Sequence, residues 1–176
     1  MTVTRPGYVA AGRVDADEIR QVVLLVEDPE LAGVSIGDLG MVLDVRVAGP
    51  QVEVDLAPTF LGCVAVGLIS LDIEGRVLGH SPAIRGCTVN IVHRTWSTDR
   101  ITANGEAVLK DLGIVVVRPG DSLEQVLCPY CRRPTLTARG GAGPTRCRTV
   151  AWCDSCRTVV EAMQPKSSSH PTGQTS

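Results

Sequence analysis

The sequence predicts an α+β protein: a small mixed sheet with helices on one side, followed by a short cysteine-rich ribbon. Three observations indicate this class. Over residues 15–120, segments with apolar residues at helical spacing alternate with runs of β-branched residues. Four of the cysteines that follow form two C-x2-C pairs. The charge balance also changes at Cys128. Residues 1–127 contain 10 basic and 17 acidic residues, whereas residues 128–176 contain 7 basic and 2 acidic ones. We therefore expect two differently charged parts.

Composition excludes several classes of protein. The chain has 176 residues and is 44% hydrophobic, which is enough for one core or two small ones. No run reaches the roughly 18–20 apolar residues of a membrane span, and the N-terminus lacks the basic start and apolar stretch of a signal peptide. We therefore expect a soluble, cytoplasmic protein. In that reducing compartment, seven cysteines favour metal binding or thiol chemistry over a disulfide framework.

The first expected elements are a helix and a hairpin. A capping pattern at Asp15 precedes apolar residues at helical spacing, and the helix should end at Asp28, because Pro29 disfavours helical geometry in the residue before it. The β-branched runs 41–48 and 51–57 are separated by a Gly-Pro turn. They predict a β-hairpin.

A second helix, a third strand and a third helix are expected next. Residues 63–78 contain four apolar side chains near helical spacing, namely Val64, Leu68, Leu71 and Val77. The alternating segment 85–93 predicts a strand. Ser97 or Thr98 can then cap a helix that Gly113 terminates in the left-handed conformation.

These patterns divide the chain into five segments. A flexible start at 1–14 precedes an α+β domain at 15–120, and Pro119-Gly120 begins a linker at 121–127. Residues 128–163 contain too few apolar side chains for a core of their own, so a metal should hold them together. The polar end, 164–176, should be disordered.

Two cysteine pairs, 21 residues apart, predict a metal site formed by Cys128, Cys131, Cys153 and Cys156. Two thiolates on each tight turn complete a tetrahedron around zinc, which leaves no position open for a substrate. The expected role is structural. Iron in a four-thiolate site, or a bound cluster, remains an alternative. Cys147 lies close enough in sequence to replace one of the four ligands.

Cys63 lies between the end of a predicted strand and the start of a predicted helix. Helix amides and the helix dipole would lower the pKa of its thiol, making it a nucleophile or a metal ligand. The alternative is a small buried side chain, which is also the expectation for Cys87 inside a strand. The histidines share no ligand spacing, and no phosphate loop or nucleophile elbow is present. We therefore expect a protein that is not an enzyme.

Several motifs resemble known families. The segments 28–30 and 35–42, with Pro58-Thr59 and Cys63 after them, resemble the SufT-like family of iron–sulfur assembly domains. Residues 96–101 and the C-terminal cysteine pairs are similar to the PaaD family of accessory subunits of phenylacetyl-CoA ring epoxidases. The resemblance implies a SufT-like domain at 15–120 and a zinc ribbon at 128–163. It places five residues in the motif loops of the first domain: Cys63, Thr59, Asp28, Glu30 and Asp38.

The function implied by this resemblance is that of an accessory or maturation factor for a multicomponent aryl-CoA ring-oxygenating enzyme of phenylacetate catabolism. Cys63 would transiently hold iron or an iron–sulfur cluster for an oxygenase or reductase subunit, and zinc would be structural. A homodimer that pairs two Cys63 residues would supply a better cluster site. The alternatives are a subunit that couples reductase to oxygenase, and a zinc-ribbon module that binds nucleic acid. Binding to nucleic acid is the weaker of these two alternatives, because aromatic side chains that could stack on bases are scarce, at 3% of the chain.

Overall fold

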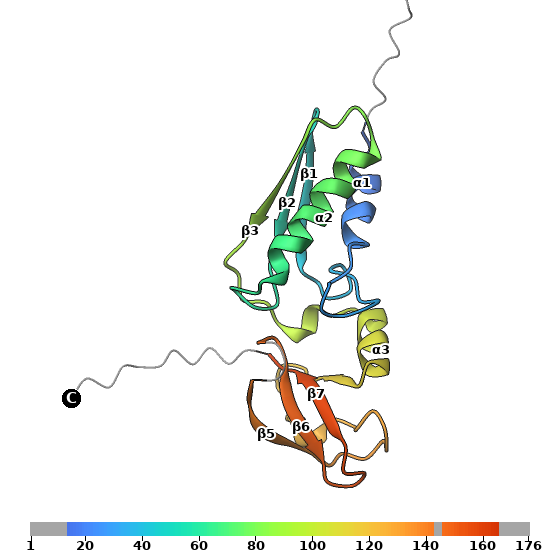
Figure 1. Cartoon of the computed structure of the whole chain (residues 1–176), viewed down its shortest axis with the longest axis vertical. Helices are drawn as coiled ribbons and strands as arrows, with labels where there is room; N and C mark the ends of the chain where they lie inside the picture. The colour runs from blue at the N-terminus through green and yellow to red at the C-terminus, as the bar shows by residue number, and fades with distance from the viewer. Residues whose placement is uncertain (1–13, 143–145, 166–176) are drawn as a thin grey trace, which may run out of the picture.

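A computed structural model describes residues 14–142 and 146–165, which form two sheets arranged along the long axis of the molecule (Figure 1). The first sheet contains β1 (Val42–Ala48), β2 (Gln51–Leu56) and β3 (Gly86–Ile91) in that order. β1 and β2 are antiparallel, whereas β2 and β3 are parallel. Helices α1 (Ala16–Leu24) and α2 (Ala65–His80) pack against each other and cover one face of this sheet (Figure 1). The predicted mixed sheet with helices is therefore confirmed.

The second sheet has four strands in the order β4-β7-β6-β5. Their bounds are β4 (Ile114–Val116), β5 (Leu136–Ala142), β6 (Thr149–Cys153) and β7 (Val159–Met163). β5, β6 and β7 form an antiparallel ribbon, and β4 adds to β7 in parallel. The short 3-10 helix η1 (Thr98–Arg100) and the helix α3 (Ala103–Asp111) connect the two sheets, and the 3-10 helix η2 (Leu123–Gln125) lies between β4 and β5 of the second sheet.

Strand β4 joins the two parts of the molecule. It comes from the segment expected to belong to the first domain, yet its hydrogen-bonded neighbour is β7 of the ribbon. Successive side chains of a strand point to opposite faces, and here Ile114 and Val116 pack into the first core while Val115 and Val117 pack into the core of the ribbon. Met163 of β7 is fully buried in the first core. The two cores therefore share a strand.

Helix α1 ends at Leu24, so the expected extension to Asp28 is wrong. The backbone N–H of Gly37 donates to the carbonyl of Leu24 (3.1 Å), and that of Ile36 donates to the carbonyl of Val26 (2.7 Å). These carbonyls are thus hydrogen-bonded to the following loop. The loop replaces the last turn of the expected helix.

Helix α2 presents a different face to the sheet from the one that the spacing predicted. Its buried side chains are Ala65, Ile69, Ile73 and Val77. Val64, Leu68 and Leu71 are instead 85%, 60% and 65% exposed. Because α2 is apolar on nearly every side, spacing alone could not identify the face that packs against the sheet.

Helix α3 begins later than predicted. Its N-cap is Thr102, whose hydroxyl accepts the backbone N–H of Gly105 at 3.0 Å. Thr98 is fully buried, and its hydroxyl donates to the carbonyl of Val117 at 2.6 Å, so it cannot cap the helix. The helix ends as expected, with Gly113 in the left-handed region at φ 77°.

The segment 96–101 connects the first domain with β4. The indole N–H of Trp96 donates to the carbonyl of Leu39 at 2.8 Å, and Nε of Arg100 donates to the carbonyl of Gly40 at 2.7 Å. Thr98 reaches the end of β4 through Val117. This motif therefore has a structural role.

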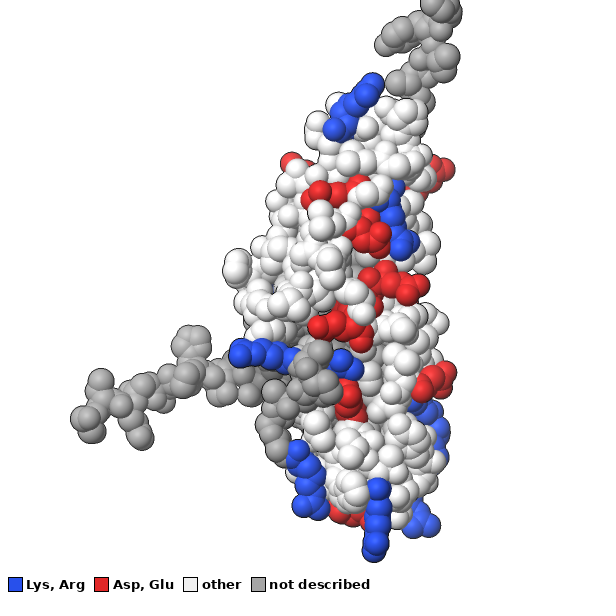
Figure 2. All heavy atoms as spheres, in the orientation of Figure 1, with Lys and Arg blue, Asp and Glu red and all other residues white. Residues whose placement is uncertain are grey.

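The charges follow the two-part organisation. On the face shown in Figure 2, acidic side chains extend along the first domain to the region where it meets the ribbon, and basic side chains gather on the ribbon. Within the described residues, none of the helices has both the length and the apolar character needed to cross a membrane. The predicted flexible start and disordered tail fall almost entirely outside the described residues.

Candidate functional site

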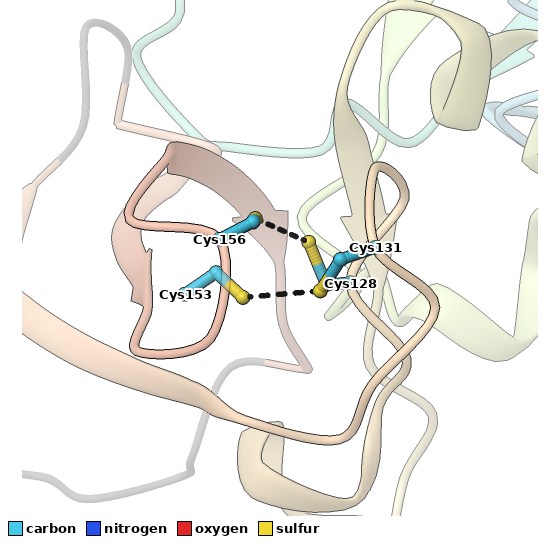
Figure 3. Close-up of side chains that lie close together, drawn as sticks. All are labelled: Cys128, Cys131, Cys153 and Cys156. Carbon is cyan, nitrogen blue, oxygen red and sulfur yellow. Dashed lines mark hydrogen bonds between the residues drawn. The ribbon is translucent and has the colours of Figure 1, made fainter.

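Four cysteine side chains converge between the two turns of the ribbon (Figure 3). The sulfur atoms of Cys128, Cys131, Cys153 and Cys156 all lie within 4.8 Å of one another. Sγ of Cys128 is 3.7 Å from that of Cys156, and Sγ of Cys131 is 3.5 Å from that of Cys153. Sulfur atoms at about 2.3 Å from a central zinc ion lie about 3.8 Å apart in a tetrahedron. The four cysteines therefore fit a closed tetrahedral metal site.

The two cysteine turns have the same backbone geometry. Arg132 and Arg157 follow the second cysteine of each pair and adopt left-handed conformations, with φ 63° and 56°. Their N–H groups donate to the carbonyls of Cys128 and Cys153 at 2.9 and 2.8 Å. Each turn thus aims two thiols at one point. This repeated geometry explains why the doubled C-x2-C spacing indicates a metal site.

Local hydrogen bonds prepare part of the site for ionisation. The backbone N–H of Cys156 and the hydroxyl of Thr135, 3.2 Å from Sγ, lower the pKa of the Cys153 thiol. Burial instead raises the pKa of Cys128. A metal ion would compensate for this burial, because it replaces the proton with a positive charge.

Cys63 lies where the loop after β2 enters α2. Its thiol is half-buried, and its backbone N–H donates to the carbonyl of Phe60 at 3.2 Å. Burial is the main reason why the pKa of Cys63 is raised, and the carboxylates of Glu30 and Asp28 raise it further. The backbone N–H of Ala65 acts in the opposite direction. The expected lowering of this pKa is therefore wrong, because burial and acidic neighbours outweigh the helix amides.

Asp28, Glu30 and Thr59 occupy the loops beside this thiol. The carboxylate of Asp28 accepts the backbone N–H of Glu30 at 2.8 Å and is only 7% exposed. Its burial raises the pKa of its carboxyl. Thr59 is also buried, at 6% exposure. The structure thus places a thiol, a buried carboxyl and a second acidic side chain close together.

Asp38 is engaged elsewhere. Its carboxylate accepts hydrogen bonds from the hydroxyl of Thr102 (2.6 Å), the amide of Asn104 (3.0 Å) and the hydroxyl of Ser35 (2.9 Å). Desolvation opposes ionisation of this carboxyl, but the hydrogen bonds outweigh it and lower the pKa of Asp38. Asp38 therefore fixes the loop after α1 to the start of α3.

Sequence reasoning missed the residues that the ribbon brings to the Cys63 loops. Cζ of Arg146 lies 5.5 Å from the centroid of the Phe60 ring. The charge of Arg148 lowers the pKa of Asp28, in opposition to burial, and Cys147 is near enough to raise the pKa of Cys63. In the sequence, only the basic charge of the ribbon indicated such a contact. Cys147 is not part of the four-cysteine group.

We expect alkylating agents to label Cys63 faster than Cys87 in the folded, zinc-bound protein. Burial and the charge of Glu74 raise the pKa of Cys87 to about 11, and it gains no helix amide. The Ala65 N–H partly offsets the burial of Cys63. Mass spectrometry after brief labelling measures both rates, and labelling of Cys87 should keep rising until the pH reaches about 11. If Cys63 is labelled only after denaturation, it is a buried structural residue.

Comparisons with known proteins agree with this two-part organisation. Residues 16–91 match the family of iron-sulfur cluster assembly proteins, and residues 115–164 match the PaaD zinc beta ribbon domain. The chain is 30% identical over 146 residues to an Escherichia coli strain K12 protein whose name assigns it to 1,2-phenylacetyl-CoA epoxidase as one of its subunits. That alignment covers 80% of this chain and 87% of the relative.

Two solved structures are also similar. A domain of unknown function, DUF59, from Bacillus anthracis superposes with a TM-score of 0.50 and 28% identity over 53% of this chain and 90% of its own. Rv1466 from Mycobacterium tuberculosis, a protein associated with Fe-S complex assembly and repair, is 29% identical over 62% of this chain and 98% of its own, with a TM-score of 0.34. The two family matches contain Cys63 and the four-cysteine group, respectively.

Proposed function

We propose a function from the premise that this chain belongs to the PaaD family of 1,2-phenylacetyl-CoA epoxidase subunits, with an iron-sulfur assembly domain and a PaaD zinc ribbon. The protein is a maturation factor that is not itself an enzyme. It carries iron, or a nascent iron–sulfur cluster, to a subunit of a multicomponent aryl-CoA ring-oxygenating enzyme of the phenylacetyl-CoA type. Its partners are the oxygenase or reductase subunits.

The observation that carries this proposal is the setting of Cys63. A half-buried thiol beside the carboxylates of Asp28 and Glu30 attracts a metal cation, and one protein thiolate holds it weakly enough to release it. The four-cysteine group has no open ligand position, so it suits a structural zinc ion rather than a transferred one. Cargo therefore belongs at Cys63.

The described histidines supply no general base for a catalytic thiol. Nε2 of His80 lies 3.6 Å from a carboxylate oxygen of Glu18, at the far end of α2 from Cys63. His93 is exposed just after β3. A cysteine nucleophile needs a neighbouring base or a lowered pKa, and the pKa of Cys63 is raised. These features support a carrier role over a catalytic one.

The test is to produce the partner subunits with the wild-type chain, with Cys63→Ala, with the matched control Cys87→Ala, or without any of them. We expect less iron or fewer clusters in the partners, and low ring-oxygenating activity, with Cys63→Ala and without the chain. The Cys87→Ala variant should support full iron content. Circular dichroism must show that both variants are folded, because loss of packing would also abolish function.

One result would overturn the proposal. Partners made without this chain would contain full iron and become active at once when the purified chain is added. The protein would then be a component of the working complex that couples reductase to oxygenase. Iron content measured before mixing separates the two functions.

A further inference from the structure

Helix α2 exposes a continuous row of apolar residues on the side that faces away from the sheet. Val64, Leu68, Leu71 and Leu78 are 85%, 60%, 65% and 44% exposed. Together with Gly75, which is also exposed, they follow one another at alternating intervals of four and three residues. That spacing places all five on one stripe of the helix, about 21 Å long. We call this stripe the outer α2 face.

Packing within the described part of the chain does not account for the outer α2 face. A separate row of buried side chains packs against the rest of the first domain: Ala65, Ile69, Ile73 and Val77. A helix that is apolar on nearly every side is normally buried on every side. With 16 residues, three of them charged, α2 is too short and too polar to cross a membrane. Its outer face therefore fits contact with another protein.

Three glycines on the exposed side of α2 support this interpretation. Gly67, Gly75 and Gly79 are exposed, and a Cβ atom on any of them would meet nothing within 4 Å. None of them has the positive φ that favours glycine. Glycine weakens the interior of a helix, so the fold of the isolated chain gives no reason for it here. A glycine does allow another helix to approach more closely, because the distance between packed helices depends on the side chains at their contact.

The outer α2 face begins beside the candidate cargo thiol. Val64 follows Cys63 directly in the sequence, and Leu61, two residues before Cys63, is 47% exposed. A protein that docks along the outer α2 face would therefore extend to Cys63. This position fits the subunit that receives the cargo.

The border of the outer α2 face is acidic. By helical spacing, Glu74 lies on one side of the row and Asp72 on the other, where Arg76 pairs with Asp72 at 3.0 Å. Beyond that pair, α1 carries the exposed Asp17 and Glu18. In Figure 2, the surface over the N-terminal half of α2 is white, and red side chains border it on the side of α1. Two copies of this chain would bring like charges together, whereas a partner with basic residues would be attracted.

We propose that the outer α2 face binds an amphipathic helix of the oxygenase or reductase subunit that receives the cargo. The partner helix carries apolar residues at heptad spacing, and lysine or arginine residues flank them. Its apolar side chains pack between the leucines of α2 and over the glycines. The inference rests on the proposed carrier function and adds the surface that holds the receiving subunit next to Cys63.

The test titrates the zinc-loaded full chain with each purified oxygenase and reductase subunit. One subunit should bind wild type, with an affinity that falls as the salt concentration rises. The double variant Leu68→Gln/Leu71→Gln should bind at least ~10-fold more weakly, because residues near the centre of an interface carry most of the binding free energy. Glutamine is a good helix former, so the variant should stay folded. The control Leu112→Gln changes a leucine at the end of α3 that is 45% exposed, and should bind like wild type.

A second variant separates docking from folding. Gly75→Gln places a side chain in open space on α2, so the unfolding temperature of the isolated chain should rise. The same side chain should obstruct the partner helix and weaken binding by at least ~10-fold. A variant that is more stable yet binds like wild type would overturn the proposal.

The outcomes separate docking from the carrier function, because affinity reports the first and the iron content of the partner reports the second. If the double variant binds like wild type, or if no subunit binds wild type, the docking surface is wrong. Loss of partner iron with Cys63→Ala would then still support the carrier function. If Cys63→Ala delivers full iron, the carrier function fails, whereas weakened binding of the double variant would still support docking on this face.

Sedimentation velocity of the chain alone tests the other occupant. The chain should be a monomer at the concentrations used for the titration. A dimer that the Leu68→Gln/Leu71→Gln variant does not form would show that a second copy covers the outer α2 face, and would overturn the proposed partner helix.

Discussion

Replacing Cys153 with serine should abolish zinc binding and unfold the ribbon. Cys153 is fully buried, and its sulfur lies 3.5 Å from that of Cys131. Structural zinc contributes about 10–16 kcal/mol of apparent binding free energy in small zinc domains, and that free energy is largely their folding free energy. Elemental analysis should find about one zinc ion per wild-type chain and almost none in the variant. Limited proteolysis should then cut within residues 128–163.

The same substitution should also destabilise the first domain. Unfolding of the ribbon separates β7 from β4 and removes Met163 from the first core. Loss of a buried methionine side chain alone costs about 2–5 kcal/mol. We therefore expect the first sheet to remain folded with a lower unfolding temperature, measured by circular dichroism.

The control for this experiment is Cys87→Ser, which changes a half-buried cysteine of β3 far from the metal ligands. It should retain zinc and a protected ribbon. Undiminished zinc in Cys153→Ser would mean that Cys147 or another ligand replaces the lost thiol. Zinc loss with an unchanged unfolding temperature of the first domain would contradict the coupling through β4.

The sequence was most informative where function depends on spacing along the chain. The doubled C-x2-C pattern places four thiols on two identical turns, and each turn forms from its own local hydrogen bonds. The β1–β2 hairpin is local in the same way, because a short turn joins its two strands. In both cases, neighbouring residues determine the geometry.

The sequence was least informative where two distant segments meet. All four residues from Ile114 to Val117 are buried, because β4 lies between two cores, so they show no alternation that would predict a half-buried strand. The raised pKa of Cys63 depends on burial and on carboxylates from another loop. The effect of Cys147 on the pKa of Cys63 depends on how the ribbon packs against the first domain. Long-range contacts of this kind leave no periodic signal in the chain.

Gly40→Ala should destabilise the protein by about 3 kcal/mol. Gly40 has φ 63°, a left-handed conformation that costs other residues roughly 1–2 kcal/mol. A Cβ atom at this position would also lie 2.4 Å from the carbonyl oxygen of Arg100, which is backbone and cannot rotate away. Overpacking of this kind typically costs a further ~1–3 kcal/mol. The loop after α1 and the segment 96–101 would have to move apart, which would also strain the hydrogen bonds of Asp38 to Thr102 and Asn104.

The matched control is Gly49→Ala. Gly49 has nearly the same φ, 60°, in the turn between β1 and β2, but a Cβ there would meet nothing within 4 Å. Gly49→Ala should therefore lower the free energy of unfolding only by the cost of the backbone strain, about 1 kcal/mol. Denaturant unfolding of the two zinc-bound variants measures both losses, and their difference reports the contact with Arg100. If both variants lose the same free energy of unfolding, the loop can relax around the added methyl group. The close approach of Gly40 to Arg100 would then not hold the first domain to the segment that leads into β4.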